Sequence, residues 1–341
     1  MRFSAFVVAV FAALLLLSCD NRGDMLPRSG GMPYEVTVAG DVDSIVYNAL
    51  SADMEGLPQS EPMFDVREAT VTTDEALSGV LKYARSLLLV DINPKKYSSV
   101  CLGVKHNVYA DPQVIVVLCA PSASALREEV SGGRLGGFSA NVIDSIRSHE
   151  TAISIADLRR KHNPKMEAEV KRMFGFDMLI PPDMTSFKCG KDFLWISNDS
   201  PTAMLNICVY GSNFSKRDSV MRVNIKGETD SMYMTTVHES CRVKYACEGT
   251  GWLSWHDWHG LWEMKGDAMG GPLVARTIWG LRQHTPVTVE GFVYAPGQKK
   301  RNLVMRLEAV LRTVGKTGHG VGSQHDAMAH KNKNGKPVHV D

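Results

Sequence analysis

The sequence predicts an α+β protein in which mainly antiparallel sheets carry helices packed on one face. Apolar runs of strand length alternate with helical patterns along the chain, which favours a mixture of both elements. Several strand-length runs also follow one another directly, as they do in antiparallel meanders. With 44% hydrophobic residues, the chain can bury a sizeable core in one large or two smaller domains.

The N-terminus has the pattern of a secretory signal. Arg2 precedes an unbroken apolar run from Phe6 to Leu17, and a cysteine, Cys19, follows it closely. The run is shorter than the roughly 20 apolar residues of a membrane-spanning helix. Residues 1–18 are therefore expected to be a cleaved signal peptide, and residues 19–33, which are polar and contain Gly and Pro, a tether.

Residues 34–162 are expected to form an N-terminal α+β half. Apolar runs bounded by polar turns predict its strands, at residues 34–39, 64–71, 86–92, 100–104 and 114–119. Amphipathic spacing predicts one helix capped by Asp41 or Asp43 and a second, over residues 74–85, capped by Thr73. Residues 140–160 carry a helical pattern that we expect to form more than one piece.

Residues 163–314 are expected to form a C-terminal α+β half. Asn163-Pro164 begins a helix that Gly175 closes. The predicted strands span residues 176–180, 193–196, 204–210, 261–265, 273–278 and 287–294. Further helices are expected near residues 215–225 and 298–313. Residues 315–341 are polar, contain four histidines and lack periodicity, which is typical of a disordered tail.

The two halves share a sequence of elements that suggests an internal duplication. Three strands and a helix lead through Ala120-Pro121 in the first half and through Ala295-Pro296 in the second. A repeated strand-strand-strand-helix unit would explain this similarity, and so would two unrelated meanders. Both interpretations are open.

Six cysteines remain once Cys19 is set apart: Cys101, Cys119, Cys189, Cys208, Cys241 and Cys247. Cys101 and Cys119 flank one predicted turn, and Cys189 and Cys208 flank another, so each pair could meet across two strands in an exported protein. The alternative, which the apolar strands favour, is that all four are small core residues. Their spacing does not match a structural zinc site.

Five of the six tryptophans lie between residues 252 and 279. Trp252, Trp255, Trp258 and Trp262 are candidates for a ligand-binding surface, because indole rings stack on sugars and anchor protein partners. The competing interpretation, which the usual burial of Trp favours, places them in the core. On a helix, the first three would share one side, whereas a strand would alternate them.

The same window holds the only candidate catalytic cluster, formed by His256, Asp257, Glu263 and Asp267. An imidazole oriented by a carboxylate can act as a general base. His256 and His259 would need helical geometry to share a metal ion, and no third ligand follows at a useful spacing, so we predict neither a metal site nor a cofactor.

Charge limits the kinds of partner. The chain has 38 basic and 37 acidic residues, and loss of Arg2 with the signal peptide leaves 37 of each. A balanced surface exerts no long-range attraction on nucleic acid or acidic lipid. We therefore expect no nucleic-acid partner.

Two stretches carry a resemblance to known families. Leu16-Leu17-Ser18-Cys19 resembles the lipobox of bacterial lipoproteins, in which the cysteine is lipidated and becomes the first residue. The alternative is an ordinary signal peptide with an incidental cysteine. The segment 260–272, followed by 289–296, resembles an uncharacterised family of Bacteroidetes lipoproteins built on a domain of unknown function. Shorter matching pieces lie at residues 57–62, 90–94 and 216–221.

The resemblance implies an exported protein that a lipid on Cys19 anchors, most simply to the outer membrane, with either face of that membrane open. We expect a non-enzymatic binding or structural module whose partner is a glycan or an envelope protein. The alternative is a hydrolase of envelope or dietary glycans or peptides that uses the cluster at residues 256–267.

Overall fold

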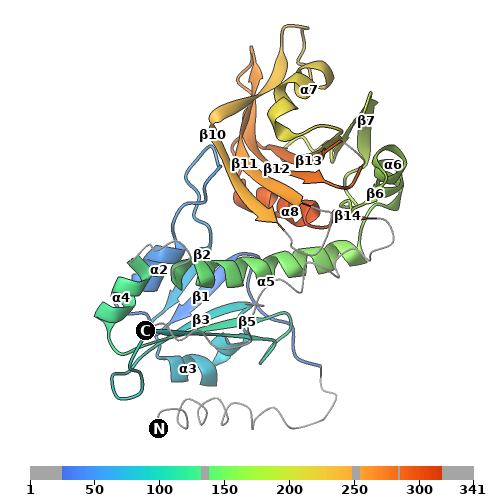
Figure 1. Ribbon diagram of the computed structural model, residues 1–341. Helices are drawn as coiled ribbons and strands as arrows, with labels where there is room; N and C mark the ends of the chain where they lie inside the picture. The colour runs from blue at the N-terminus through green and yellow to red at the C-terminus, as the bar shows by residue number, and fades with distance from the viewer. Residues whose placement is uncertain (1–24, 132–137, 248–253, 283–284, 317–341) are drawn as a thin grey trace.

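The computed structural model describes residues 25–131, 138–247, 254–282 and 285–316. Its strands form one five-stranded sheet, one seven-stranded sheet and a two-stranded pair. Figure 1 shows the long helix α5 (Phe138–Arg160) lying between the two large sheets. The predicted α+β class is confirmed.

The five-stranded sheet belongs to the N-terminal half and has the order β2-β1-β3-β5-β4. Its strands are β1 (Glu35–Ala39), β2 (Asp65–Ala69), β3 (Ser86–Ile92), β4 (Cys101–His106) and β5 (Val114–Ala120). The pairings of β1 with β2, β1 with β3 and β3 with β5 are parallel, and only β4 runs antiparallel to its neighbour. This differs from the antiparallel expectation, because helical connections between successive strands allow parallel pairing.

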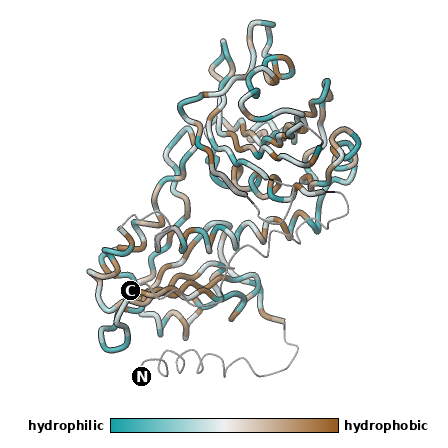
Figure 2. The backbone as a smooth tube through the Cα atoms, in the orientation of Figure 1, coloured by the Kyte–Doolittle hydropathy of each residue, from teal (hydrophilic) through white to brown (hydrophobic). Residues whose placement is uncertain are grey.

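Helices cover both faces of this sheet, not one. The core on one side contains residues of α2 (Ile45–Leu50), α4 (Ala123–Ser131) and α5. On the other side, α3 (Thr73–Ser78) and the 3₁₀ helix η2 (Val80–Tyr83) contribute Ala76, Leu77 and Leu81. Central strands of such a sheet are apolar along their length, as the brown strands of Figure 2 show.

The seven-stranded sheet belongs to the C-terminal half and is antiparallel throughout, in the order β10-β11-β12-β13-β9-β8-β7. Its strands are β7 (Ser186–Gly190), β8 (Phe193–Ser197), β9 (Met204–Tyr210), β10 (Tyr233–Cys247), β11 (Ser254–Lys265), β12 (Gly270–Trp279) and β13 (Val287–Tyr294). Helices α6 (Pro164–Phe174) and α8 (Arg301–Leu311) share a core with one face, and α7 (Arg217–Asn224), preceded by η3 (Phe214–Lys216), covers the other.

Local sequence signals account for several element ends. The carboxylate of Asp41 accepts backbone N–H groups of Val46 and Tyr47 at 3.0 and 2.9 Å, so Asp41 caps α2. At α3 the cap is Thr72, one residue before the predicted one, in a capping box with Glu75. Gly175 closes α6 with a φ of 76°, as predicted. Residues 138–160 form a single helix, whereas we expected more than one piece.

Of the two open interpretations of the repeated element order, the structure does not support an internal duplication. The strands before Ala120 lie in the order β3-β5-β4 and mix parallel with antiparallel pairing, whereas β11, β12 and β13 form a simple antiparallel meander. The two Ala-Pro junctions therefore follow strands of different topology.

The ends of the chain are partly integrated into the fold. The signal peptide, Cys19 and residues 20–24 lie outside the described residues, as do residues 317–341 of the predicted tail. The last residues of the predicted tether are bound to the N-terminal half. The Gly30 N–H donates to the Tyr83 carbonyl, and the Gly30 carbonyl accepts from the Arg85 N–H. Gly315 and Lys316 form β14, which pairs with β6 (Phe176–Asp177). Of the helices in the described ranges, none has the length and apolar character needed to cross a bilayer.

One loop of the N-terminal half contacts the C-terminal half directly. The carboxylate of Glu61 accepts the backbone N–H groups of Lys300 and Arg301 at 2.8–2.9 Å, at the start of α8. The Arg301 guanidinium returns to this half, donating to the Pro62 carbonyl at 2.9 Å and to Asp65 at 2.5 Å. Helix α8 is therefore held by both halves.

Candidate functional site

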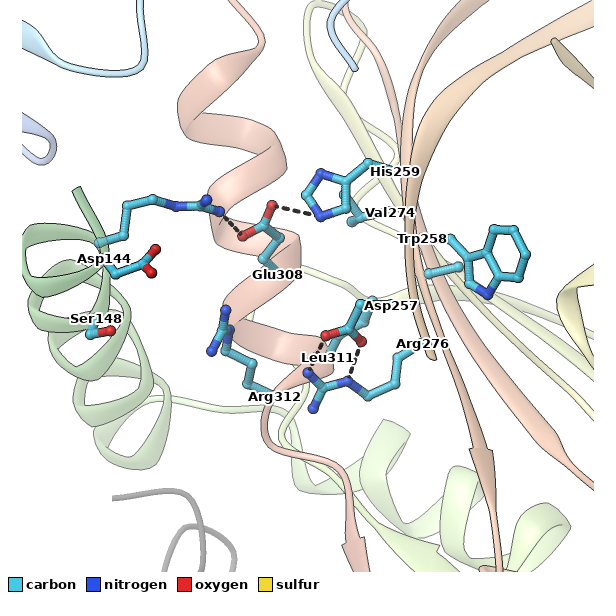
Figure 3. Close-up of a pocket in the computed structure, with 12 residues that line it drawn as sticks. Asp144, Ser148, Asp257, Trp258, His259, Val274, Arg276, Glu308, Leu311 and Arg312 are labelled. Carbon is cyan, nitrogen blue, oxygen red and sulfur yellow. Dashed lines mark hydrogen bonds and ion pairs between the residues drawn. The ribbon is translucent and has the colours of Figure 1, made fainter. Parts of the chain in front are cut away.

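A cavity of about 110 Å³ opens where α5 meets the C-terminal sheet and α8 (Figure 3). Side chains of α5, β11, β12 and α8 line it. Three arginines and three carboxylates contribute to the lining, together with one histidine: Arg147, Arg276, Arg312, Asp144, Asp257, Glu308 and His259. A cavity lined by several charged side chains is the default place to look for a binding site, so we take it as the candidate site.

Strand β11 places two of these groups by its alternation. Successive side chains of a strand point to opposite faces, so Asp257 and His259 share the α8 face and Trp258 points away from them, as Figure 3 shows. Arg276 lies directly opposite Asp257 in the register of β11 and β12. Its guanidinium donates to both Asp257 oxygens, at 2.7 and 2.8 Å. This bidentate pair closes one wall of the cavity.

The aromatic ring of Trp255 packs against Arg276 in this wall. The guanidinium of Arg276 stands 5.2 Å from the centroid of the Trp255 ring, a cation–π contact. Both side chains are buried, so the charge of Arg276 is held by Asp257 and by the ring face. The position of the Asp257–Arg276 pair is fixed by these contacts.

Glu308 joins the helices to the sheet. One of its oxygens accepts from Arg147 of α5 at 3.1 Å, and the other lies 3.4 Å from Nε2 of His259. The Glu308 side chain is buried. Its carboxylate therefore lies between a permanent cation and an imidazole, three groups supplied by three separate elements.

The negative charge of Glu308 also affects Tyr34, a residue of the N-terminal half. Burial, and next to it the negative charge of Glu308, raises the pKa of Tyr34 well above its ordinary value. In the described part of the chain, the Tyr34 hydroxyl is buried without a hydrogen-bond partner, and so is the Trp258 indole N–H. Tyr34 thus stays protonated as a neutral donor at physiological pH.

Two charged groups of the cavity have no direct partner among the described residues, since the side chains of Asp144 and Arg312 make no hydrogen bond or ion pair there. The negative charges of Glu308 and Asp257 nevertheless act on Arg312, and burial lowers its pKa. Figure 3 shows the Asp144 carboxylate directed from α5 toward α8 and the Arg312 guanidinium directed from α8 toward α5. The cavity therefore offers one available anion and one available cation on facing helices.

Two family patterns match the chain. Residues 29–134 match one domain of unknown function (DUF8532), and residues 163–313 match another (DUF4837). The chain carries two domains of unknown function. No curated protein matches it. Residues 29–134 are called the DUF8532 domain below, and residues 163–313 the DUF4837 domain. Helix α5, which supplies Asp144 and Arg147, lies between the two matched segments.

The four candidate catalytic residues do not converge. Asp257 lines the cavity, but its neighbour His256 falls on the opposite face of β11, where its ring meets Trp279 at 4.6 Å. Glu263 and Asp267 are exposed, one near the end of β11 and the other in the following turn. Within the described residues, no set of three or more His, Cys, Asp or Glu side chains is arranged to hold a metal ion.

The candidate tryptophans that the structure describes are buried or half-buried, so these described residues form no exposed stacking platform. Trp255 and Trp262 are buried, and the Trp262 N–H donates to the Val293 carbonyl at 3.1 Å. Trp258 is half-buried and stacks on Phe214 with 4.6 Å between centroids. Trp252 lies outside the described residues. Because β11 is a strand, Trp258 and Trp262 share one face and Trp255 lies on the other.

Of the two cysteine pairs that could meet across strands, one is brought together, as free thiols, and the favoured interpretation of core residues is wrong for Cys101 and Cys189, which are exposed. Cys101 and Cys119 are direct partners across β4 and β5. Cys189 and Cys208 are not neighbours, because β8 lies between their strands; Cys189 faces Leu194 and buried Cys208 faces Trp195. The side chain of Cys247 lies outside the described part of the structure.

The sequence analysis did not identify the other charged residues of the cavity, because they belong to no known motif. For two of them, Arg276 and Glu308, the sequence nevertheless contains a signal. Arg276 interrupts the apolar strand Leu273–Ile278, and Glu308 interrupts the apolar face of the last helix. A charged residue at a core position is rarely left unpaired. Arg147, Asp144 and Arg312 gave no such signal, since each lies on a surface that is polar in the sequence pattern.

Proposed function

We propose that this protein is a lipid-anchored, non-enzymatic binding protein of the bacterial envelope, of the Bacteroidetes lipoprotein type that it resembles. Its export and its anchor rest on the signal-like N-terminus and on Cys19. Two or more acyl chains hold a protein on a membrane stably, each buried CH₂ contributing about 0.8 kcal/mol. The outer membrane is the proposed location.

The anchor is tested by replacing the lipidated residue. Cys19→Ala should release the protein from the membrane fraction of cells, while Ser18→Ala, which leaves Cys19 in place, should not. Protease treatment of intact cells then assigns the face: digestion of the wild type places the domains outside, and protection until the outer membrane is opened places them in the periplasm. Unchanged membrane association of Cys19→Ala would refute lipid anchoring.

The observation that carries the binding function is the pair of available charges in the cavity. Arg312 supplies a cation and Asp144 an anion, on opposite sides of a cavity whose other charges are already paired. A ligand that carries both an anionic and a cationic group satisfies both, whereas a neutral sugar satisfies neither. The proposed ligand is accordingly a small zwitterion or a peptide end presented by an envelope component.

Binding is tested with amino acids and short peptides, and with the same compounds carrying acetylated amines or amidated carboxyls. A ligand at 100 times its dissociation constant stabilises a protein by about 2.7 kcal/mol, so thermal unfolding is a sensitive readout. Arg312→Gln should weaken binding of the free-carboxyl compounds and Asp144→Asn that of the free-amine compounds. Arg222→Gln and Asp230→Asn, which change exposed charges elsewhere in the DUF4837 domain, are the matched controls.

A hydrolase is the second candidate, because His259 lies 3.4 Å from the buried Glu308 carboxylate. A carboxylate beside an imidazole orients the ring and stabilises the imidazolium that forms when the ring accepts a proton as a general base. The wild type separates the two functions, because a pure binding protein turns over no peptide or glycoside substrate. If the wild type does turn over a substrate, His259→Gln should abolish that turnover while ligand binding persists.

A further inference from the structure

The DUF8532 domain holds two thiols face to face at the edge of its sheet. Cys101 of the edge strand β4 and Cys119 of β5 are directly paired in the antiparallel register. Directly opposed residues in such a pair have Cα atoms about 4.5–5.5 Å apart. That separation falls within the range of about 4.4–6.8 Å that disulfides span without moving the backbone.

The thiols are also in contact with each other and accessible. Their side chains are hydrogen-bonded to one another, Cys101 is exposed, and Cys119 is half-buried. Neither is sealed in the core in the way that Cys208 is. A reagent in solution can therefore reach this pair.

The groups around the pair favour a thiolate on Cys119. Asp91 of β3 is paired with Cys119 on the other side of β5. The Asp91 carboxylate accepts hydrogen bonds from the Lys96 ammonium at 2.7 Å and from the Tyr97 hydroxyl at 2.5 Å. The pKa of Cys119 is lowered to about 7, chiefly by the hydrogen bond from Cys101. Tyr97 and Lys96 also lower this pKa, whereas burial and the charge of Asp91 raise it. The same contact raises the pKa of Cys101.

We propose that Cys101 and Cys119 form a reversible dithiol–disulfide site that reacts with external disulfides. The Cys119 thiolate attacks one sulfur of the external disulfide, which breaks that bond, forms a mixed disulfide and releases a first thiol. Cys101 then loses its proton, attacks the Cys119 sulfur and releases the second thiol. Two protein thiols are oxidised to one disulfide, and the external disulfide takes up the two electrons and two protons. The product ties the edge strand β4 covalently to β5.

This inference stands on the register and the contacts of the two cysteines and does not depend on the proposed ligand or anchor. The test uses the purified full-length chain, equilibrated with oxidised and reduced glutathione at a series of ratios, alkylated and digested with trypsin. Lys105 lies between the two cysteines, so trypsin separates residues 97–105 from residues 106–127. Only a disulfide keeps those two peptides together.

The linked peptide pair should accumulate as oxidised glutathione increases, should disappear on reduction, and should form at the same fraction when the protein is diluted. Recovery of the two peptides separately at every ratio, with both cysteines alkylated or glutathionylated, would overturn the proposal. Exposed Cys189 provides an internal reference, since it can take glutathione but has no partner across its strand pair.

Single variants test the order of attack. Cys101→Ser keeps a hydrogen-bond donor beside Cys119, and the mixed disulfide should accumulate on Cys119 with a rate that rises through pH 7. In Cys119→Ser, Cys101 should react many times more slowly at neutral pH. Faster reaction of Cys101 would contradict the assigned order. A higher midpoint of thermal unfolding after oxidation, absent in both variants, would show that the bond forms within the folded sheet.

Discussion

At the scale of single residues, the most demanding contact is the buried pair Arg217–Glu290. It lies between α7 and the seven-stranded sheet. Arg217 donates to both Glu290 oxygens at 2.8 and 2.7 Å, and both side chains are almost fully excluded from solvent. Thr236 accepts a third hydrogen bond from the guanidinium, at 2.9 Å, and the Tyr210 hydroxyl donates to Glu290 at 3.2 Å. Each ion is thereby compensated in a medium where an unpaired charge is costly.

Arg217→Met should lower the free energy of unfolding by about 3–5 kcal/mol, because it leaves the Glu290 carboxylate buried without its cation. The double variant Arg217→Met with Glu290→Met removes both charges and should lose less than the single variant. Urea unfolding followed by tryptophan fluorescence measures both. A double variant less stable than the single one would contradict this account.

His149 makes stability depend on pH. Burial, followed by the charges of His106 and Arg85, lowers the pKa of His149 from 6.5 to about 4 in the folded protein. Between those values the unfolded chain takes up a proton that the folded protein does not, so the free energy of unfolding falls as the pH is lowered from about 6.5 to 4. The shift corresponds to a loss on the order of 3 kcal/mol across this window.

The measurement is urea unfolding at a series of pH values. His149→Phe removes the titrating group and should flatten this part of the profile, whereas His238→Gln, at an exposed site, should leave it as in the wild type. A profile with the same slope in His149→Phe would mean that another group is responsible.

The residue scale also shows where prediction from the sequence ends. Caps such as Asp41 and Gly175 were predictable, because their chemistry is local. Asp257 was recognised as a candidate, but its partner Arg276 is 19 residues away, and only the register of two strands brings them together. The mistaken grouping of His256 with Asp257 has the same origin, since it depended on whether the segment is a helix or a strand.

At the scale of elements, α8 begins with a cap that its own sequence does not supply. Lys300, at the cap position, makes no side-chain cap, and the first N–H groups donate to Glu61 of the DUF8532 domain. A carboxylate there satisfies the free donors and interacts favourably with the positive end of the helix.

Glu61→Ala should lower the free energy of unfolding by about 1–3 kcal/mol, because it leaves buried N–H groups without an acceptor. Glu61→Gln retains an uncharged acceptor and should lose less. Glu75→Ala, which removes half of the exposed capping box of α3, is the matched control and should cost less than Glu61→Ala. Urea unfolding separates the three. Equal losses for Glu61→Ala and Glu75→Ala would show that burial of the α8 cap adds nothing.

At this scale the sequence predicted where most strands lie but not how they pair. Runs such as Ser86–Ile92 were found with their observed bounds, because burial on both faces gives a continuous apolar stretch. A continuous apolar run is typical of a parallel sheet covered on both faces, but it does not identify the neighbouring strand. The same limit left the internal duplication open, because the order of the elements matched although their topology does not.

At the scale of the whole molecule, the candidate site is shared. The DUF4837 domain supplies His259, Arg276, Glu308 and Arg312, the connecting helix α5 supplies Asp144 and Arg147, and Tyr34 of the DUF8532 domain lies close to Glu308. The two matched segments are thus insufficient separately to build the site.

A fragment of residues 163–316 tests this dependence. It lacks Glu61 and Arg147, so the N–H groups at the start of α8 lose their acceptor and the Glu308 carboxylate loses its arginine. We expect it to unfold at a lower urea concentration than the full chain and to show no ligand-induced stabilisation. A fragment that matches the full chain in both measurements would place the site within the DUF4837 domain alone.

The cap on α8 also has a consequence for the order in which the chain is assembled. Glu61 precedes Lys300 by 239 positions, so its carboxylate is synthesised long before the N–H groups that it receives. Helix α8, the last helix in the described part of the chain, therefore docks onto a domain that has had time to fold during synthesis. Docking of α8 therefore depends on a folded first domain. Damage to the first domain should prevent α8 from packing correctly.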